Sequence, residues 1–200
     1  LMWKKSIERV NKLETNHSCS QILKDSKNNL LFLFSNSEEP DNLVGNHGTI
    51  LIRMSQTGNL LWMKDFNDAE CNGVFAQINS PFTNSQSYSP TMIEYNNEII
   101  ILMSTSLENY NTQQQYGPFA NDQFSIRFDL NGNFLTYTKF SLGTLGYGSD
   151  LTRTFHFRKL LKNENNKLYV LGEVLKKLNG QYVNEPFVAE FQPGFNSTYG

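Results

Sequence analysis

The chain reads Ile52-Arg53-Met54-Ser55-Gln56-Thr57-Gly58-Asn59-Leu60-Leu61, and 74 residues later it reads Ile126-Arg127-Phe128-Asp129-Leu130-Asn131-Gly132-Asn133-Phe134-Leu135. Five of these ten positions are identical, and two more keep a large apolar side chain. An internal repeat of such a period indicates one supersecondary unit stacked on copies of itself. This stretch therefore decides the architecture, although it specifies no ligand and no reaction.

Three Asn pairs mark the phase of the repeat, and each stands between a short apolar stretch and a run of strand-forming residues. The pairs are Asn28-Asn29, Asn96-Asn97 and Asn165-Asn166, at spacings of 68 and 69 residues. Asn tolerates positive φ, so each pair predicts a tight turn between two strands. Further along the second copy, Asn131-Gly132 predicts a two-residue hairpin turn with positive φ at both residues.

The pattern predicts four antiparallel strands in a copy, of which the third copy shows three. Each copy opens with a short strand, at 22–23, 92–93 and 160–161. The later strands are expected at 30–35, 50–54 and 60–66, then at 99–104, 124–128 and 134–140, then at 168–172 and 187–191. Four such strands form the blade of a β-propeller. We predict an all-β fold, a β-propeller-type repeat of about three four-stranded antiparallel blades. The chain is taken as one domain, 1–200, with repeats at 15–66, 85–140 and 155–200.

The two ends of the chain complement each other in this scheme. The third copy lacks a fourth strand, whereas Leu1–Ile7 resembles the fourth strand Leu61–Phe66. Residues 1–7 are thus interpreted as a spare outer strand that could close the ring and remove an exposed sheet edge. Closed propellers usually have at least four blades. Three interpretations stay open: a segment of a larger propeller, which we favour, a ring completed by several chains, or an open stack.

Composition excludes several classes of function. The net charge of −2 gives no electrostatic footprint for nucleic acid. Apolar residues make up 38% of the chain, with no run long enough for a membrane span. The 25 Asn residues and the 13% aromatic content favour strands and turns over helices. Two cysteines, Cys19 and Cys71, are too few for a disulfide framework, and the sequence leaves open whether they are paired.

The repeat resembles those of β-propellers in bacterial secreted and cell-surface proteins. Such repeats end in an apolar strand, an Asp/Ser-x-Asn-Gly-Asn turn and a Leu-Trp-x-Lys-x-Phe strand. Here the match runs through Ile52–Phe66 and again through Ile126–Phe140, with Thr136 in place of Trp62. The resemblance covers about two thirds of the chain and is moderately specific for the fold. It implies an extracellular or cell-envelope location, but no particular function.

Motifs that carry chemistry are weak. Asp129-Leu130-Asn131-Gly132-Asn133 looks like the start of a calcium loop, but the twelfth position is Phe140 instead of Glu, so a structural turn is expected. His156 is expected on a strand surface, and Trp62 in packing between blades. The spacing of Glu70, Asp122, Asp150 and Glu173 predicts no catalytic pair of carboxylates. No cofactor and no metal site are predicted.

The most informative loop is Glu108–Asp122, which is rich in amides and aromatic residues and nearly free of charge. Tyr and amide side chains make adaptable polar contacts at recognition surfaces. We therefore predict Tyr110, Gln115 and Tyr116 as binding residues for a protein or glycan partner on one propeller face. The predicted function is a non-catalytic interaction or adhesion module, not an enzyme, outside the cell or at its surface, assembled with the rest of a larger propeller where one exists. The alternatives are a glycan-acting enzyme on a propeller scaffold and a purely structural segment.

Overall fold

The computed structural model of the chain describes residues 17–36, 49–65, 85–107, 121–140, 154–178 and 181–193. These residues form three antiparallel sheets, which we call blades 1, 2 and 3. Blade 1 contains β1 (His17–Lys24), β2 (Leu30–Asn36), β3 (Ile50–Met54) and β4 (Leu60–Asp65). Blade 2 contains β5 (Ser85–Tyr95), β6 (Glu98–Leu107), β7 (Asn121–Asp129) and β8 (Phe134–Phe140). Blade 3 contains β9 (Thr154–Lys162), β10 (Leu168–Leu178) and β11 (Gln181–Phe191).

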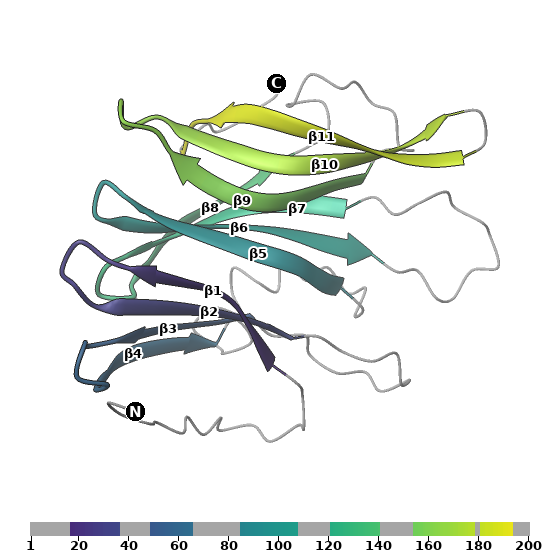
Figure 1. Cartoon of the computed structure of the whole chain (residues 1–200). Helices are drawn as coiled ribbons and strands as arrows, with labels where there is room; N and C mark the ends of the chain where they lie inside the picture. Colours follow the sequence, from purple (N-terminus) through teal and green to yellow (C-terminus); the bar gives the residue numbers. More distant parts are fainter. Residues whose placement is uncertain are drawn as a thin grey trace.

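Each blade is a meander in which every strand pairs with the next strand of the chain (Figure 1). The blades lie on one another as three layers, with blade 2 in the middle (Figure 1). No described residue is helical. The predicted all-β fold, with blades of four antiparallel strands, is thereby confirmed. The third sheet has three strands in the described part of the chain, and the predicted closing strand at 1–7 lies outside the described residues.

Four of the hairpins share one five-residue turn. It begins at Asp25, Ser55, Asp129 and Asn163. In each turn the first residue donates its backbone N–H to the carbonyl of the fifth, and its side-chain oxygen accepts the N–H of the fifth at 2.8–3.1 Å. The fourth residue has positive φ, and it is Asn28, Gly58, Gly132 or Asn166. This is a three-residue loop that ends in a left-handed residue.

The prediction for Asn131-Gly132 was therefore wrong in turn type. Only Gly132 has positive φ, at 85°. The Asp129 side chain makes the three-residue loop the favoured alternative, because it holds the backbone N–H groups of Asn131 and Asn133. The two-residue turn with both φ values positive occurs once in the described residues, at Asn96 and Asn97 (52° and 63°), between the paired residues Tyr95 and Glu98.

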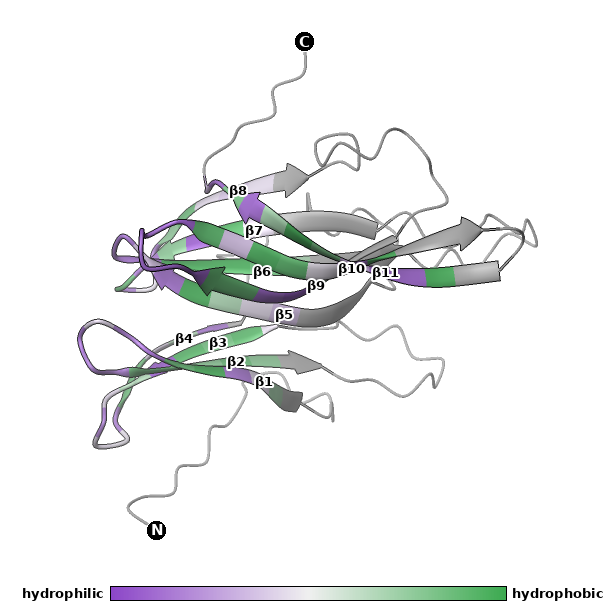
Figure 2. Cartoon of the chain, turned by 45° about the horizontal axis from the view of Figure 1, so that its top comes forward, coloured by the Kyte–Doolittle hydropathy of each residue, from purple (hydrophilic) through white to green (hydrophobic). Residues whose placement is uncertain are grey.

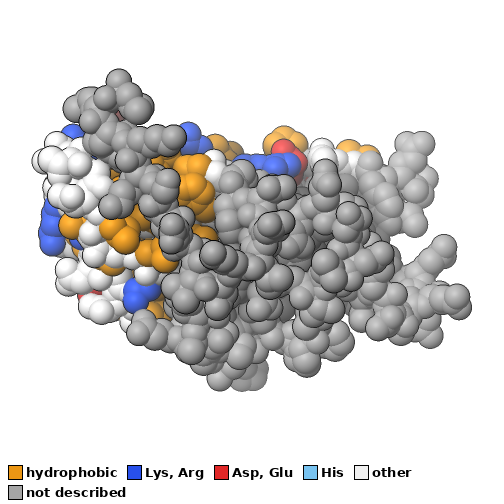
Figure 3. Space-filling model, turned by 90° about the horizontal axis from the view of Figure 1, so that it is seen from below, with side chains coloured by type: hydrophobic (Ala, Val, Ile, Leu, Met, Phe, Trp, Pro, Cys, Tyr) orange, Lys and Arg blue, Asp and Glu red, His pale blue; other side chains and the backbone are white. Residues whose placement is uncertain are grey.

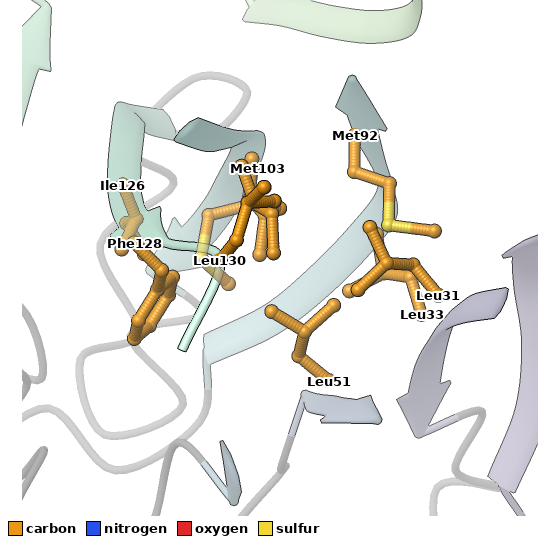
Figure 4. Packing of buried hydrophobic residues seen from close by; sticks show 10 residues of the cluster. Leu31, Leu33, Leu51, Met92, Met103, Ile126, Phe128 and Leu130 are labelled. Carbon is orange, nitrogen blue, oxygen red and sulfur yellow. The ribbon is translucent and has the colours of Figure 1, made fainter. Parts of the chain in front are cut away.

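In every blade we call the face that corresponds to the blade 1 face turned toward blade 2 the forward face, and the opposite face the rear face; the strand register identifies equivalent positions. The apolar residues on the forward face of blade 1 are Leu23, Leu31, Leu33 and Leu51. It packs on the rear face of blade 2, whose residues include Met92, Ile101, Ile126 and Phe128 (Figure 4). Both faces of blade 2 are thus covered. This explains why β6, a central strand of that blade, is apolar at every position from Ile99 to Met103 (Figure 2).

The second interface repeats the first. The forward face of blade 2 contributes Ile93, Ile100 and Leu102. It packs on the rear face of blade 3, which contributes Leu160, Val170 and Phe191. The same strand positions therefore make the same kind of contact at both junctions, as the internal repeat predicts.

Candidate functional site

The two ends of the blades differ in their connections. At one end, the turn end, the strands are joined by the short hairpins at 25–29, 55–59, 96–97, 129–133 and 163–167. At the opposite end, the loop end, the longer connections leave after Asn36, Asp65, Leu107 and Phe140. Binding residues of β-rich scaffolds are commonly carried by such loops on a rigid frame. The loop end is therefore the candidate site.

The predicted binding residues Tyr110, Gln115 and Tyr116 lie outside the described residues. The segment that contains them is anchored at both sides, because it begins after Leu107 and ends at Asn121. The register pairs Ser106 with Asn121, so the two anchors are neighbours on adjacent strands at the loop end. The frame that holds this predicted binding segment is thus described, although the segment itself is not.

The first strands of the three blades are joined to one another by side chains. The Gln21 amide donates to the Met92 carbonyl at 2.9 Å and accepts the Met92 backbone N–H at 2.7 Å. Thr91 occupies the equivalent place in blade 2, and its hydroxyl accepts the backbone N–H of Leu160 at 3.1 Å. Each contact joins one blade to the main chain of the next. Such bonds fix the positions of the first strands relative to one another along the strand direction.

The first strand of each blade contains a bulge near these contacts. The register shifts at Cys19/Gln21 in β1, at Tyr88/Thr91 in β5 and opposite Leu171/Gly172 in β9. A bulge bends its strand and increases the local twist. Three bulges at corresponding places therefore bend the first strands alike. Sequence patterns did not predict this feature, since neither Gln21 nor Thr91 belongs to a recognisable motif.

Of the four candidate carboxylates, Glu70 and Asp150 lie outside the described residues. Asp122 is the second residue of β7, paired with Thr105, and therefore stands at the loop end. Glu173 lies on the face of blade 3 that is turned away from blade 2, and it forms an ion pair with Arg158 at 3.0 Å. Glu173 is therefore engaged with Arg158 on that face.

The turn end has its own network, which is structural. Asp25 is 4% exposed and binds Arg53, with 2.7 Å between Nε and Oδ2. Arg53 also donates to the Leu130 carbonyl of blade 2, and the indole N–H of Trp62 donates to the same oxygen at 3.0 Å. Both residues thus fasten blade 1 to a hairpin of blade 2. The predicted packing role of Trp62 between blades is confirmed.

The Asp129 carboxylate has a turn-capping role. Its oxygens accept the backbone N–H groups of Asn131 and Asn133 at 2.8 Å and the Asn133 amide at 2.7 Å. Desolvation is the largest single influence and raises the pKa of Asp129, but the hydrogen bonds from Asn133 and Asn131 together outweigh it and lower that pKa below its usual value. Within the described ranges, no three His, Cys, Asp or Glu side chains are grouped to hold a metal ion.

Two further residues named from the sequence occupy ordinary places. His156 belongs to β9 and is paired with Glu173 in the register, so its predicted position on a strand is confirmed. Cys19 is an exposed free thiol, whose pKa is raised by partial burial against the opposing effect of its hydrogen bond to the Gln21 carbonyl. No helix in the described part of the chain is long and apolar enough to cross a membrane.

Comparison with known proteins finds solved structures with a similar fold. Neither a protein-family model nor a curated protein matches the chain. The fold is similar to the crystal structure of endo-arabinase from Bacteroides thetaiotaomicron VPI-5482, with a TM-score of 0.52 and 11% identity, over 94% of this chain and 61% of that chain. A thermostable family-43 glycoside hydrolase also matches, with a TM-score of 0.42 and 12% identity, over 92% of this chain and 62% of that one. The chain thus spans about three fifths of the length of each.

This comparison corrects the predicted function. The expectation of a non-catalytic interaction or adhesion module, and of no enzymatic activity, is contradicted because a solved structure with a similar fold is that of an enzyme, an endo-arabinase. The finding favours the alternative of a propeller scaffold that acts on glycans. The resemblance to repeats of secreted and cell-surface proteins is supported only at the level of the β-propeller fold. The chain therefore folds as antiparallel blades of a β-propeller, with a likeness to the fold of an endo-arabinase.

Proposed function

We propose that this chain is part of a glycan-acting enzyme that hydrolyses a polysaccharide at the loop end of its blades. The observation that carries the proposal is the likeness of the fold to an endo-arabinase over 94% of the chain. An arabinose-containing polysaccharide is therefore the first substrate class to examine. Because a propeller scaffold hosts many activities, the residues at the loop end must supply the chemistry.

Hydrolysis of a glycosidic bond requires two carboxylic groups about 5–10 Å apart, one of them a general acid. Asp122 fits one of these roles by position, because it is the second residue of β7, a central strand that begins at the loop end. Glu70 and Asp150 are the candidates for its partner. Glu173 is the weaker candidate, because its carboxylate is already paired with Arg158 and faces away from blade 2.

Tyr110, Gln115 and Tyr116 complete the proposed site as sugar-binding residues. Aromatic rings offer flat apolar surfaces to sugar rings, and the Gln amide both donates and accepts hydrogen bonds. We assign these residues to substrate binding and not to the chemical step. Replacing both tyrosines by Ala should therefore raise KM more than it lowers kcat.

The test is the release of reducing ends from a panel of polysaccharides that includes arabinan, with the natural full-length polypeptide as the enzyme. We expect cleavage of at least one polysaccharide. Asp122→Asn should lower kcat by about 10³-fold or more, since it removes one of two essential carboxylates. Glu173→Gln is the matched control and should retain most of the activity.

Two results would count against the proposal. If no polysaccharide is either cleaved or bound, the glycan-acting function is refuted. If Glu173→Gln abolishes cleavage while Asp122→Asn leaves it intact, the function stands but our choice of carboxylate is wrong. We also propose an extracellular or cell-envelope location, which would suit a polysaccharide substrate, and cell fractionation with an antibody against the chain would test it.

A further inference from the structure

Blade 3 has a forward face with nothing from the described residues packed on it. Its apolar residues are Leu161, Tyr169, Leu171 and Val188. By register they correspond to Leu23, Leu31, Leu33 and Leu51, the forward face of blade 1. Leu31, Leu33 and Leu51 are fully buried against blade 2, whereas Val188 is 67% exposed and Leu161 is 37% exposed. The same positions are therefore covered in blade 1 and open in blade 3.

Charged residues lie at the border of this apolar surface at two places. Lys167 and Glu190 form an ion pair at 3.2 Å on the turn-end side. Arg158 and Glu173 form another at 3.0 Å toward the loop end. An apolar centre with a charged, solvent-accessible rim is the usual composition of a protein interface. The first ion pair also has a counterpart in blade 2 with the charges exchanged, Glu98 with Arg127 at 2.5 Å.

The chain shows twice what such a face binds. The forward faces of blades 1 and 2 each pack on the rear face of a following blade, formed by residues such as Met92 and Ile101, or Leu160 and Val170. The occupant expected for blade 3 is thus a sheet that presents a rear face of this repeat. Lys159 stands where Gln21 and Thr91 reach the next blade, and it is exposed.

A second copy of this chain is a poor source of that rear face. The rear face of blade 1 includes Ile52 and Met54, and both are already buried, with 3% of their surface exposed. Ile22, on the same face, remains 60% exposed. Figure 3 shows the molecule from the side of blade 1, where apolar side chains form a visible patch. The central residues of this face, Ile52 and Met54, are therefore already buried within the chain, while Ile22 and Leu60 on the two outer strands remain open to a neighbouring molecule.

We propose that the forward face of blade 3 is the docking surface for a fourth blade of the same repeat, carried by polypeptide beyond these 200 residues. The three blades span 61% of the endo-arabinase chain that they resemble, which leaves room there for about two more of the same size. The fourth blade covers Val188 and Leu161, and the two ion pairs lie at its rim. This inference concerns assembly, so it stands or falls separately from the proposed glycan hydrolysis.

The test is thiol labelling at the centre of the face. Val188→Cys is made in a background of Cys19→Ser and Cys71→Ser, and Glu164→Cys, an exposed turn position of blade 3, is the matched control. Maleimide labelling is compared between the 200-residue chain and the natural full-length polypeptide, with light scattering to establish that each is monomeric. In the 200-residue chain both cysteines should react quickly. In the full-length polypeptide, labelling at position 188 should slow by about tenfold or more while labelling at 164 stays unchanged.

Two outcomes overturn the proposal. Equal labelling of position 188 in both polypeptides means that no further blade covers the face, and this includes the case of a natural polypeptide without another repeat. Slow labelling already in the 200-residue chain, together with a dimer in light scattering, means that a second copy is the occupant. Val188→Lys distinguishes this case, because it would then return the 200-residue chain to a monomer.

Discussion

The contact between Gly132 and Trp62 gives the most quantitative prediction about how the blades are joined. Gly132 has a φ of 85°, and a Cβ added there would lie 2.9 Å from Cδ2 and 3.1 Å from Cε2 of Trp62. Gly132→Ala therefore has two costs. The left-handed backbone costs an L-residue about 1–2 kcal/mol, and crowding against the indole costs about 1–3 kcal/mol more. The total loss of stability should be about 2–5 kcal/mol.

A double-mutant cycle separates these two costs. In a Trp62→Ala background the ring is gone, so Gly132→Ala should cost only the backbone term of about 1–2 kcal/mol. The coupling between the two sites should then be about 1–3 kcal/mol. Urea unfolding followed by far-UV circular dichroism provides the four free energies of unfolding, compared at constant m. If Gly132→Ala costs the same with and without the indole, blade 1 does not pack on the blade 2 hairpin as described, and the reasoning fails.

Three further variants test other contacts. Gln21→Ala leaves a backbone N–H and a carbonyl of β5 without their side-chain partner and should lower the free energy of unfolding by about 1–3 kcal/mol; an unchanged urea midpoint would contradict the inter-blade role. Arg53→Met leaves the buried Asp25 carboxylate without its cation and should lower the free energy of unfolding by about 3–5 kcal/mol. The matched variant Arg127→Met removes a partly exposed ion pair and should lower it by about 1 kcal/mol or less. Equal losses would be evidence against this difference in burial. The lowered pKa of Asp129 means that its ionised form stabilises the fold above its unfolded pKa and that this contribution is lost as pH falls through the folded pKa. The stability advantage of the natural chain over Asp129→Asn should thus shrink below about pH 4, and a difference that stays constant from neutral to acid pH would refute the capping role.

The strands were predictable because their burial is encoded locally. The run Ile99–Met103 is apolar at every position, which is what a strand covered on both faces requires, and the structure buries each of these residues. The Asn pairs located the hairpins, since Asn accepts positive φ more readily than other non-glycine residues. The turn type at Asn131-Gly132 was missed because it depends on the side chain of Asp129, which lies outside the dipeptide.

The polar contacts between blades could not be predicted, because equivalent residues behave differently in different neighbourhoods. Arg53 and Arg127 occupy the same position of the repeat. Arg53 meets Asp25 and the next blade, whereas Arg127 bonds Glu98 within its own blade. The choice depends on a buried acid 28 residues away in the chain for Arg53, and periodicity contains no such information.

The candidate site shows the same limit. Glu173 was one of four carboxylates with equal claim in the sequence, and its pairing with Arg158 arises only because β9 and β10 lie side by side with a bulge between Phe157 and Lys159. Asp122 became the stronger candidate for a catalytic carboxylate because the register places it at the loop end. Neither conclusion follows from spacing along the chain.

Hydrogen exchange with and without arabinan oligosaccharides would reveal both whether a glycan binds and at which end of the blades it does so. We expect slower exchange in peptides that cover 104–124, at the loop end of β6 and β7, and no change in the hairpins at 25–29, 129–133 and 163–167. Protection confined to those hairpins, or no protection with any glycan of the panel, would contradict the proposal of a glycan-acting site at the loop end.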